Sequence, residues 1–333
     1  MRIAVLCSAH GFGHVTRQLA VAEHLTALGA APTFFTAAPA SILRETLPEL
    51  SIRPWVMDVG VVQPDGIHHD AAATLARLAS VCSEAAIDAL AEAVSGFDRA
   101  VVDVAPAGLE ACRRAGVPAL AVGNFDWAWI YRRYPALQGW ADRFADWQAP
   151  HPAVALTPGP GLRGFASVET LGVVARRRPA RRVVGSRERG VLVSFGGHAE
   201  MPLRLPSIPG VRYILSAPMP RLERPDCVYV EDVAYPSLVA GADAVLSKPG
   251  YGILAEACLA GTPLVWVDRS GWPESPSLEA AMWARGDVKI EGPVARGLPR
   301  ALRRVWGRGR PAVVPDFSAR VLAVRCLDRG FVG

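Results

Sequence analysis

Short apolar runs alternate along this chain with stretches of helical periodicity, and glycine-rich turns follow several of the runs. Residues 3–7 form a fully apolar run, and apolar side chains recur at helical spacing over residues 15–28. The second half repeats the pattern with a run at residues 244–247, a helical stretch at residues 252–260 and a further run at residues 264–267. Uniformly apolar strands that alternate with helices are typical of parallel sheets covered on both faces.

The length of 333 residues favours two domains. The alternating pattern stops near Pro150 and resumes at Gly190, and seven arginines lie between Arg176 and Arg189. We therefore expect an α/β protein with two Rossmann-like, doubly wound parallel-sheet domains that face a cleft. The expected parts are an N-terminal domain of residues 1–160, an Arg/Pro-rich linker of residues 161–189, a C-terminal domain of residues 190–315 and a final helix at residues 316–333.

The composition excludes several classes of protein. With 51% hydrophobic and 20% charged residues, the chain is neither disordered nor a disulfide-stapled scaffold. The net charge is +5, but only Lys248 and Lys289 are lysines, an arginine skew that indicates genome composition, so we expect no nucleic-acid partner. The six cysteines form no C-x-x-C pair, and the sequence shows no signal peptide or membrane-spanning run. These features predict a cytoplasmic protein with reduced thiols.

Three glycine-rich loops follow apolar runs, at residues 8–14, 194–198 and 247–252. In open α/β sheets, ligands bind beyond the carboxyl ends of the strands. Glycine there lets the backbone approach a ligand closely, and helix N-termini present free N–H groups to anions. Neither a complete G-x-G-x-x-G nor a G-x-x-x-x-G-K-[ST] motif occurs. The loops therefore favour a phosphate-bearing ligand other than NAD or the ATP of Walker-type enzymes.

His14 follows Gly11 and Gly13 at the start of the first expected helix. A histidine titrates near neutral pH, which suits a general base or a phosphate ligand; a capping or packing role is the alternative. Asp126 and Asp103 are the next candidates for a base. An aspartate in a loop such as that of Asp126 is, however, more often a turn former.

In the second half, the loop at residues 248–252 precedes a predicted helix that carries Glu256. Glu256 lies one turn beyond the loop and shares its face, so its carboxylate suits the two hydroxyls of a ribose. Backbone N–H groups of Gly196, Gly197 and the 248–252 loop, with the charge of Lys248, suit a diphosphate. A solvent-facing helix glutamate is the alternative for Glu256.

No metal is expected. His68, His69 and Asp70 are adjacent in an extended segment, so their side chains point apart. No D-x-D pair that would hold a divalent ion under a diphosphate occurs in the sequence.

An aromatic cluster extends from residue 125 to Trp147 and contains four of the nine tryptophans. Most of these rings are expected to line hydrophobic interior under a long loop. Indole faces also suit sugar stacking, and tryptophan with arginine suits a membrane interface. Peripheral membrane contact therefore stays open.

Residues 246–267 resemble the donor half of GT-B glycosyltransferases, notably the N-acetylglucosaminyltransferase that forms peptidoglycan lipid II. In that family a glycine-containing loop cradles the diphosphate and a helix glutamate binds the ribose. Gly250 and Glu256 stand at the matching spacing. The lipid II enzyme's Gln-rich sugar-contacting segment is replaced here by residues 272–276, which leaves the donor sugar open.

A closer resemblance is to the glycosyltransferase-like N-terminal half of the large L-arabinokinases. The Ser/Gly-rich ATP loop of the kinase half is missing, so arabinokinase activity is not implied. The resemblance implies a GT-B architecture with Thr16 and Arg17 on the acceptor side, and with His198, Tyr251, Gly252 and Glu274 on the donor side. The matching residues are Gly11, Phe12, Gly13, His14, Thr16, Arg17, Asn124, Phe125, Trp127, Ile130, Tyr131, Lys248, Gly250, Tyr251, Gly252, Glu256, Glu274, Pro276 and Leu278.

Together these features predict a metal-independent glycosyltransferase of the hexosyl or N-acetylhexosaminyl class. Its co-substrate would be a nucleotide-sugar, with a UDP-sugar preferred, and it would need no cofactor. The acceptor hydroxyl and the oligomeric state are not indicated by the sequence. Two alternatives stay open: a nucleotide-sugar-binding module without catalysis, and a nucleotide-sugar epimerase whose acids and bases would be Glu274, Asp103 and His198.

Overall fold

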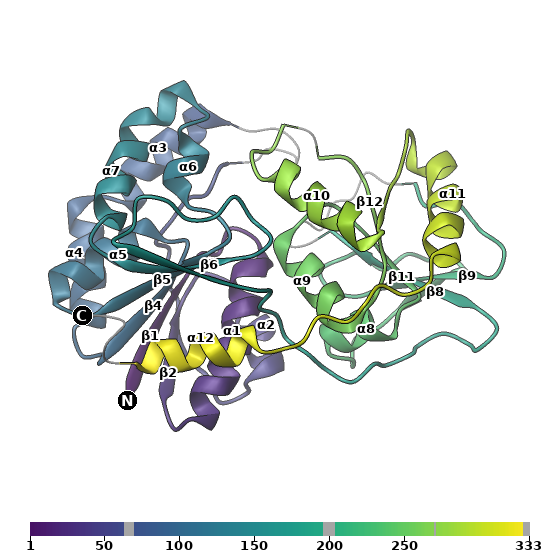
Figure 1. Ribbon diagram of the computed structural model, residues 1–333, viewed down its shortest axis with the longest axis horizontal. Coiled ribbons are helices and arrows are strands. Elements are labelled where there is room, and N and C mark those ends of the chain that lie inside the picture. Colours follow the sequence, from purple (N-terminus) through teal and green to yellow (C-terminus); the bar gives the residue numbers. More distant parts are fainter. Residues whose placement is uncertain (63–69, 196–203, 270, 329–333) are drawn as a thin grey trace. The chain divides into compact units, whose positions relative to one another are not determined.

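The computed structural model describes residues 1–62, 70–195, 204–269 and 271–328. The chain divides into two compact units, Met1–Val174 with Phe317–Gly333 and Ala175–Asp316. Each unit is built on one parallel sheet with flanking helices (Figure 1). The expected α/β class with two Rossmann-like domains is confirmed.

The first unit has a seven-stranded sheet in the order β3-β2-β1-β4-β5-β6-β7. β1 pairs in parallel with both β2 and β4, so the strand order reverses between β1 and β4. The strands are β1 Arg2–Cys7, β2 Ala31–Phe35, β3 Ser51–Arg53, β4 Arg99–Asp103, β5 Ala119–Gly123, β6 Pro152–Leu156 and β7 Ser167–Leu171. The helices are α1 Phe12–Ala27, α2 Ala40–Thr46, α3 Ala71–Val81, α4 Glu84–Val94, α5 Pro106–Ala115, α6 Trp127–Tyr131, a 3₁₀ turn at Pro135–Leu137, α7 Gln138–Gln148 and α12 Ser318–Leu327.

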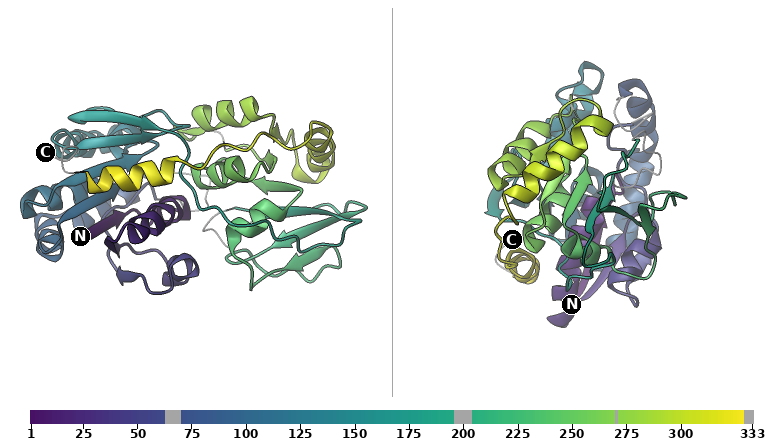
Figure 2. Two further views of the ribbon diagram at one scale, coloured as in Figure 1. Left: turned by 60° about the horizontal axis from the view of Figure 1, so that its bottom comes forward. Right: turned by 90° about the vertical axis from the view of Figure 1, so that its right-hand side faces the viewer.

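Two helices that are distant in sequence, α1 and α12, cover one face of this sheet. Leu19 of α1 and Leu322 of α12 join Val5 and Val101 of the strands in one buried cluster. Figure 2 shows α12 alongside α1. On the other face, α5 approaches so closely that a Cβ atom at Gly108 would lie 2.9 Å from a leucine side chain of β1. The sheet is therefore buried on both sides, as its apolar strands require.

The second unit has a six-stranded parallel sheet in the order β10-β9-β8-β11-β12-β13. Its strand order reverses between β8 and β11, which pair directly. The strands are β8 Arg189–Ser194, β9 Val211–Leu215, β10 Cys227–Tyr229, β11 Ala244–Ser247, β12 Leu264–Trp266 and β13 Val288–Lys289. The helices are α8 Tyr235–Gly241, α9 Tyr251–Ala260, α10 Ser275–Arg285 and α11 Val294–Gly307.

The core of the second unit is clearest at α11. Leu298, Leu302 and Val305 are spaced by four and three residues and so lie on one side of this helix. They pack against Val193 and Val265 of the sheet in one buried cluster. The arginine-rich opposite side of α11 faces solvent.

Two of the expected boundaries need correction. The stretch expected as a linker, residues 161–189, contains β7, which pairs with β6 in the first sheet, and its part from Ala175 onward belongs to the second unit. β7 was missed because it is a half-exposed edge strand without an apolar run. The final helix is also not a separate part, since α12 packs into the first unit.

No helix within the described ranges combines the length and apolarity that crossing a membrane requires. All six cysteines are free thiols, and five of them are buried. Burial raises the pKa of Cys82, Cys112 and Cys326 to about 12, which makes these thiols poor nucleophiles.

The packing of α12 on α1 generates a stability prediction. Leu322→Ala should lower the free energy of unfolding by about 2–5 kcal/mol, because a fully buried leucine leaves a cavity. Val321, its 38% exposed neighbour, gives a matched control whose alanine variant should change stability by less than about 0.5 kcal/mol. Urea denaturation measures both. Equal losses in the two variants would contradict the packing described.

Candidate active site

Both sheets reverse their strand order once, between β1 and β4 in the first unit and between β8 and β11 in the second. Ligands of doubly wound sheets bind beyond the carboxyl ends of the strands at such a reversal. The glycine-rich loops singled out in the sequence follow β1, β8 and β11. The structure therefore brings the loops after β1 and β11 to the position where this kind of fold binds ligands, whereas residues 196–198 of the loop after β8 lie outside the described residues.

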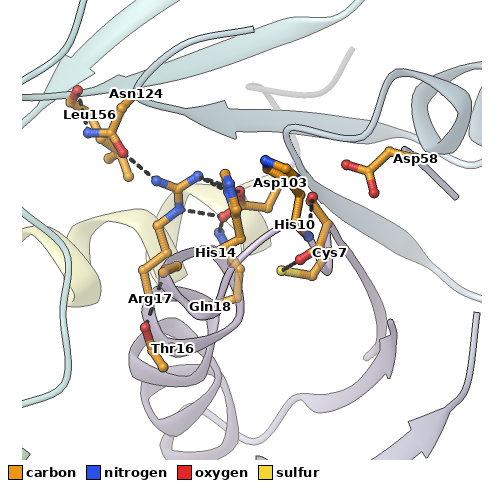
Figure 3. A network of polar contacts seen from close by, with 12 residues as sticks. Cys7, His10, His14, Thr16, Arg17, Gln18, Asp58, Asp103, Asn124 and Leu156 are labelled. Atoms are coloured by element: carbon orange, nitrogen blue, oxygen red, sulfur yellow. Dashed lines mark hydrogen bonds and ion pairs between the residues drawn. The ribbon is translucent and has the colours of Figure 1, made fainter. Parts of the chain in front are cut away.

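In the first unit a buried carboxylate, Asp103 at the end of β4, organises the reversal (Figure 3). It accepts hydrogen bonds from Nδ1 of His14 at 2.9 Å, from Nε of Arg17 at 2.6 Å and from Nε2 of Gln18 at 2.7 Å. The three donors lie at positions i, i+3 and i+4 of α1 and thus share one helix face.

The charge of Asp103 follows from these partners. Its side chain is fully buried, and burial alone would raise its pKa. The positive charge of Arg17 and the hydrogen bonds from Arg17 and His14 outweigh burial and bring the pKa of Asp103 to about 2. Asp103 is therefore an ionised carboxylate across the physiological pH range.

His14 lies in the first turn of α1. The turn begins after Gly11, whose φ of 88° lies in the left-handed region that favours glycine. Nδ1 of His14 lies 2.9 Å from Oδ1 of Asp103 and 2.9 Å from Nη2 of Arg17, and a carboxylate only accepts hydrogen bonds. In the tautomer whose Nδ1 donates to Asp103, Nε2 is left as a proton acceptor. The ring of Phe125 packs edge-on at 5.9 Å from that of His14. His14 thus has the orientation that a general base needs.

Arg17 is a structural cation of this site. It is 4% exposed, forms a two-point contact with Asp103 and also donates to Oδ1 of Asn124. Asn124, directly after β5, donates in turn to the carbonyl groups of Leu156 and Pro158 at 3.0 and 2.8 Å. Thr16 donates to the carbonyl of Gly13 at 3.3 Å. These residues fix the loop and the carboxylate.

Asp126 does not join this network. Its carboxylate caps α6 by accepting from the backbone N–H of Trp129 at 2.7 Å, which is the turn-forming alternative. Burial raises the pKa of Asp126, against hydrogen bonds from the backbone of Trp129 and Arg163. Asp126 lines a small, mainly apolar cavity of about 10 Å³ together with Val102 and Gln148.

Asp58 was missed by sequence reasoning. It is 8% exposed and accepts from Nε1 of Trp127 at 3.2 Å. Burial raises the pKa of Asp58, whereas a hydrogen bond from Ser8 and the charge of His14 oppose the rise. Asp58 follows a strand of only three residues, so no apolar run marks it. Gln18, also missed, could have been found from its spacing of four residues from His14.

Half of the eight rings in the aromatic cluster are buried, whereas Trp129, Tyr134, Trp140 and Trp147 are half-buried. Trp127, Tyr131 and Phe144 are at most 1% exposed, and Tyr131 donates to the carbonyl of Gly60 at 2.6 Å. These three rings pack against one another in tilted pairs and are unavailable to a sugar or a membrane.

In the second unit, Gly196, Gly197 and His198 lie outside the described residues. The loop after β11 leads to Gly250, which caps the ten-residue helix α9 with extended backbone. Burial and the neighbouring charge of Arg269 lower the pKa of Lys248 to about 8.

The residues that follow lie on α9. Tyr251 and Gly252 form its first turn, and the hydroxyl of Tyr251 lies 3.4 Å from Oγ of Ser277. Glu256 is not solvent-facing: it is 5% exposed and forms an ion pair with Arg176, with 3.1 Å between Nη2 and Oε1.

Glu274 precedes α10 and is 9% exposed. Burial raises the pKa of Glu274 to about 7, against the opposing charge of Arg269. The guanidinium of Arg269 lies over the ring of Trp272, 3.4 Å from its centre. Lys248 and Glu274 are thus both influenced by Arg269, at the end of the unit where β11 and β12 terminate. Within the described ranges, no three His, Cys, Asp or Glu side chains come together as metal ligands would.

Comparison with solved structures defines the class of fold. The chain superposes on the glycosyltransferase SnogD from Streptomyces nogalater with a TM-score of 0.61 at 15% identity, covering all of both chains. The calicheamicin glycosyltransferase CalG4 gives a TM-score of 0.61 at 17% identity, covering 99% of this chain and 94% of CalG4. Arabidopsis thaliana UGT89C1 complexed with UDP-L-rhamnose gives 0.59 at 12% identity, covering 98% and 94%. The chain has the GT-B fold of glycosyltransferases.

The sequence comparison identifies a particular relative. The chain is 30% identical over 299 residues to L-arabinokinase of Arabidopsis thaliana. The match covers 83% of this chain and 29% of that protein, so the chain spans under a third of its relative. No family model matches the sequence. The expected resemblance to GT-B glycosyltransferases and to L-arabinokinases is confirmed.

The buried carboxylate of the first unit generates a prediction about acid stability. Asp103 has a folded-state pKa near 2, below the usual value of about 3.9. The contribution of the ionised Asp103 to the free energy of unfolding is therefore complete above about pH 4 and is lost as pH falls from about 4 toward 2. Asp103→Asn should cost roughly 3–5 kcal/mol at pH 7, because Arg17 is left buried without its counter-charge. The difference in the free energy of unfolding between wild type and Asp103→Asn, measured by urea denaturation, should become smaller below about pH 4.

A matched control is Asp142→Asn, since the Asp142 side chain is 70% exposed and its ion pair with Arg132 spans 3.6 Å. Its effect should stay below about 1 kcal/mol at every pH. A gap between Asp103→Asn and wild type that is independent of pH would contradict the assigned ionisation.

Glu274 generates a prediction of opposite sign. Its folded-state pKa of about 7 exceeds the usual value of about 4.3. The folded state therefore binds more protons, and this glutamate costs stability increasingly as pH rises from about 4 to 7. Glu274→Gln should stabilise the protein by roughly 1–3 kcal/mol at pH 8 and by much less at pH 5. Thermal unfolding at the two pH values measures this, and equal shifts would refute it.

Proposed function

We propose that this protein is a glycosyltransferase that moves a sugar from a nucleotide-sugar to an acceptor hydroxyl. The observation that carries the proposal is the hydrogen bond of 2.9 Å between Nδ1 of His14 and the ionised Asp103, at the strand reversal of a GT-B sheet. A histidine oriented by a carboxylate is the arrangement that activates a hydroxyl nucleophile.

The proposed reaction assigns each proton and bond. Nε2 of His14 takes the proton of the acceptor hydroxyl while its oxygen attacks the anomeric carbon of the donor sugar. The bond from that carbon to the diphosphate oxygen breaks, and the nucleoside diphosphate leaves with the bonding electrons. Asp103, which the sequence offered as a second base, instead orients His14 and stabilises the imidazolium that forms.

The second unit would hold the donor. The N-terminus of α9 and the charge of Lys248 suit the diphosphate, whose negative charge grows as it leaves. We assign Glu256 to the ribose. To the diphosphate we also assign Gly196, Gly197 and His198, and to the sugar end of the donor we assign Tyr251, Gly252 and Glu274. Because these protein groups compensate the charge of the diphosphate, the proposed reaction needs neither a metal ion nor a further cofactor.

The donor is proposed as a UDP-sugar that carries a hexosyl or N-acetylhexosaminyl group. UGT89C1, a neighbour in fold, has been seen with UDP-L-rhamnose, which supports a sugar nucleotide for this architecture. A cytoplasmic location fits the six free thiols. The kinase activity of the L-arabinokinase relative is not proposed, because this chain spans only 29% of that protein.

Thermal unfolding against nucleoside diphosphates and nucleotide-sugars, with and without magnesium, tests the donor site. A ligand at one hundred times its Kd should add about 2.7 kcal/mol of stability and raise the Tm visibly. We expect a shift with at least one uridine nucleotide that is independent of magnesium. No shift with any nucleotide would overturn the proposal, and a shift only with magnesium would overturn its metal independence.

His14→Ala separates catalysis from donor binding. Transfer of radiolabelled sugar to a panel of acceptors should fall by about 100-fold or more, because the general base is lost. The Kd of the donor, measured by calorimetry, should change by less than about twofold, since His14 belongs to the first unit. His24, a half-buried histidine in the last turn of the same helix, provides the control His24→Ala, which should retain full activity. Equal loss of turnover and donor affinity in His14→Ala would contradict its role as base.

The same assay separates the alternatives. A binding module would bind the donor without releasing nucleoside diphosphate in the presence of any acceptor. An epimerase would change the sugar without an acceptor. Asp103 is a poor acid for such a step, because its pKa lies near 2 and its carboxylate is held by Arg17.

A further inference from the structure

One arginine of the basic run at residues 176–189 differs from the rest. Arg176 is 4% exposed, whereas five of the other six arginines in the run are exposed and Arg178 is half-buried. Arg182 and Arg189 pair with Asp243 near the surface. A solvated charged linker accounts for those side chains but not for the buried Arg176.

Arg176 contacts a carboxylate that the proposed function uses. Its Nε and Nη2 atoms both donate to Oε1 of Glu256, at 3.3 and 3.1 Å. Glu256 is itself only 5% exposed. Two donors from one planar guanidinium thus meet one carboxylate oxygen, which holds Oε1 in place and compensates its charge.

The pair lies among polar groups at the strand reversal of the second sheet. The charges of Glu256 and Arg176 both act on Tyr235, whose hydroxyl donates to Oγ of Ser194 at the end of β8. Ser194 is paired in register with Ser247 at the end of β11. Oγ of Ser247 is fully buried and has no hydrogen-bond partner in the described part of the chain.

The ion pair between Arg176 and Glu256 also affects how the site would bind an anion. A nucleoside diphosphate carries at least two negative charges, and a lone buried carboxylate close to it would repel it strongly. Arg176 makes the pair neutral, so that Glu256 can remain ionised and accept hydrogen bonds from a ribose without opposing the diphosphate.

We propose that Arg176 is a positioning residue of the nucleotide site: it holds the carboxylate of Glu256 in the orientation that accepts the ribose hydroxyls. This inference rests on the proposed function, which assigns Glu256 to the ribose. It also makes the first arginine of the basic run at residues 176–189 a part of the donor site. Arg176 contacts Glu256 and not the ligand, so its loss should weaken recognition of the ribose in particular.

Binding of UDP and 2′-deoxy-UDP, measured by calorimetry without added metal, tests this role. Wild type should bind UDP about tenfold or more tightly than 2′-deoxy-UDP, because a hydrogen bond to a charged group is lost. Glu256→Gln and Arg176→Met should both bring this ratio close to one. The double variant should show no further change, since both single variants remove the same interaction.

Arg177→Met is the matched control, because Arg177 is the exposed neighbour in sequence, and its ratio should equal that of wild type. Arg176→Lys is a second variant for the case that Arg176→Met does not fold. It keeps the positive charge but loses the paired guanidinium donors. Its ratio of affinities for UDP and 2′-deoxy-UDP should fall at least about threefold, while its Tm stays near that of wild type.

The outcomes are separable. If wild type binds no nucleoside diphosphate, the proposed function fails and the inference fails with it. If wild type discriminates between the two nucleotides and Arg176→Lys or a folded Arg176→Met keeps the full ratio, the positioning role alone is overturned. A purely structural arginine would lower the Tm and leave the ratio unchanged.

Discussion

The first unit depends on the burial of one carboxylate. Asp103 ends β4 with no exposure to solvent, and such a group is tolerated only when charge and hydrogen bonds compensate its lost hydration. Arg17, Gln18 and His14 provide that compensation from a single face of α1. The same contacts tie the glycine-rich loop after β1 to β4 and direct the His14 ring. The same contacts therefore stabilise the first unit and orient the proposed base.

The second unit meets a similar constraint in the same kind of place. Glu256 is buried on α9, beside the reversal between β8 and β11, and Arg176 compensates it. In both units a buried arginine compensates the carboxylate, although many of the other arginines face solvent. A planar guanidinium offers several donors at once: Arg17 contacts both oxygens of Asp103, and two nitrogens of Arg176 contact Oε1 of Glu256.

The positions of the loops after β1 and β11 were predictable because they depend on local rules. His14, Gly11 and the loop after β11 follow apolar runs, and parallel strands bring such loops to one edge of a sheet. Asp58 escaped prediction because it follows a three-residue strand, and β7 because it is an exposed edge strand. Whether an aspartate orients a histidine or caps a helix depends on which distant segments meet in the fold. For this reason the sequence did not show that Asp103 contacts His14 whereas Asp126 caps α6.

The sequence by itself determined the α/β class, the two sheets and the places of the glycine-rich loops, since apolar periodicity and glycine act over a few residues. Tertiary structure alone decided which charges are buried together. Asp103 and Arg17 lie 86 positions apart, and Arg176 and Glu256 lie 80 apart. Nothing in their own neighbourhoods distinguishes these arginines from solvated ones. The cost of burying a charge is set by the partner that the fold brings to it, and only the packed chain shows that partner.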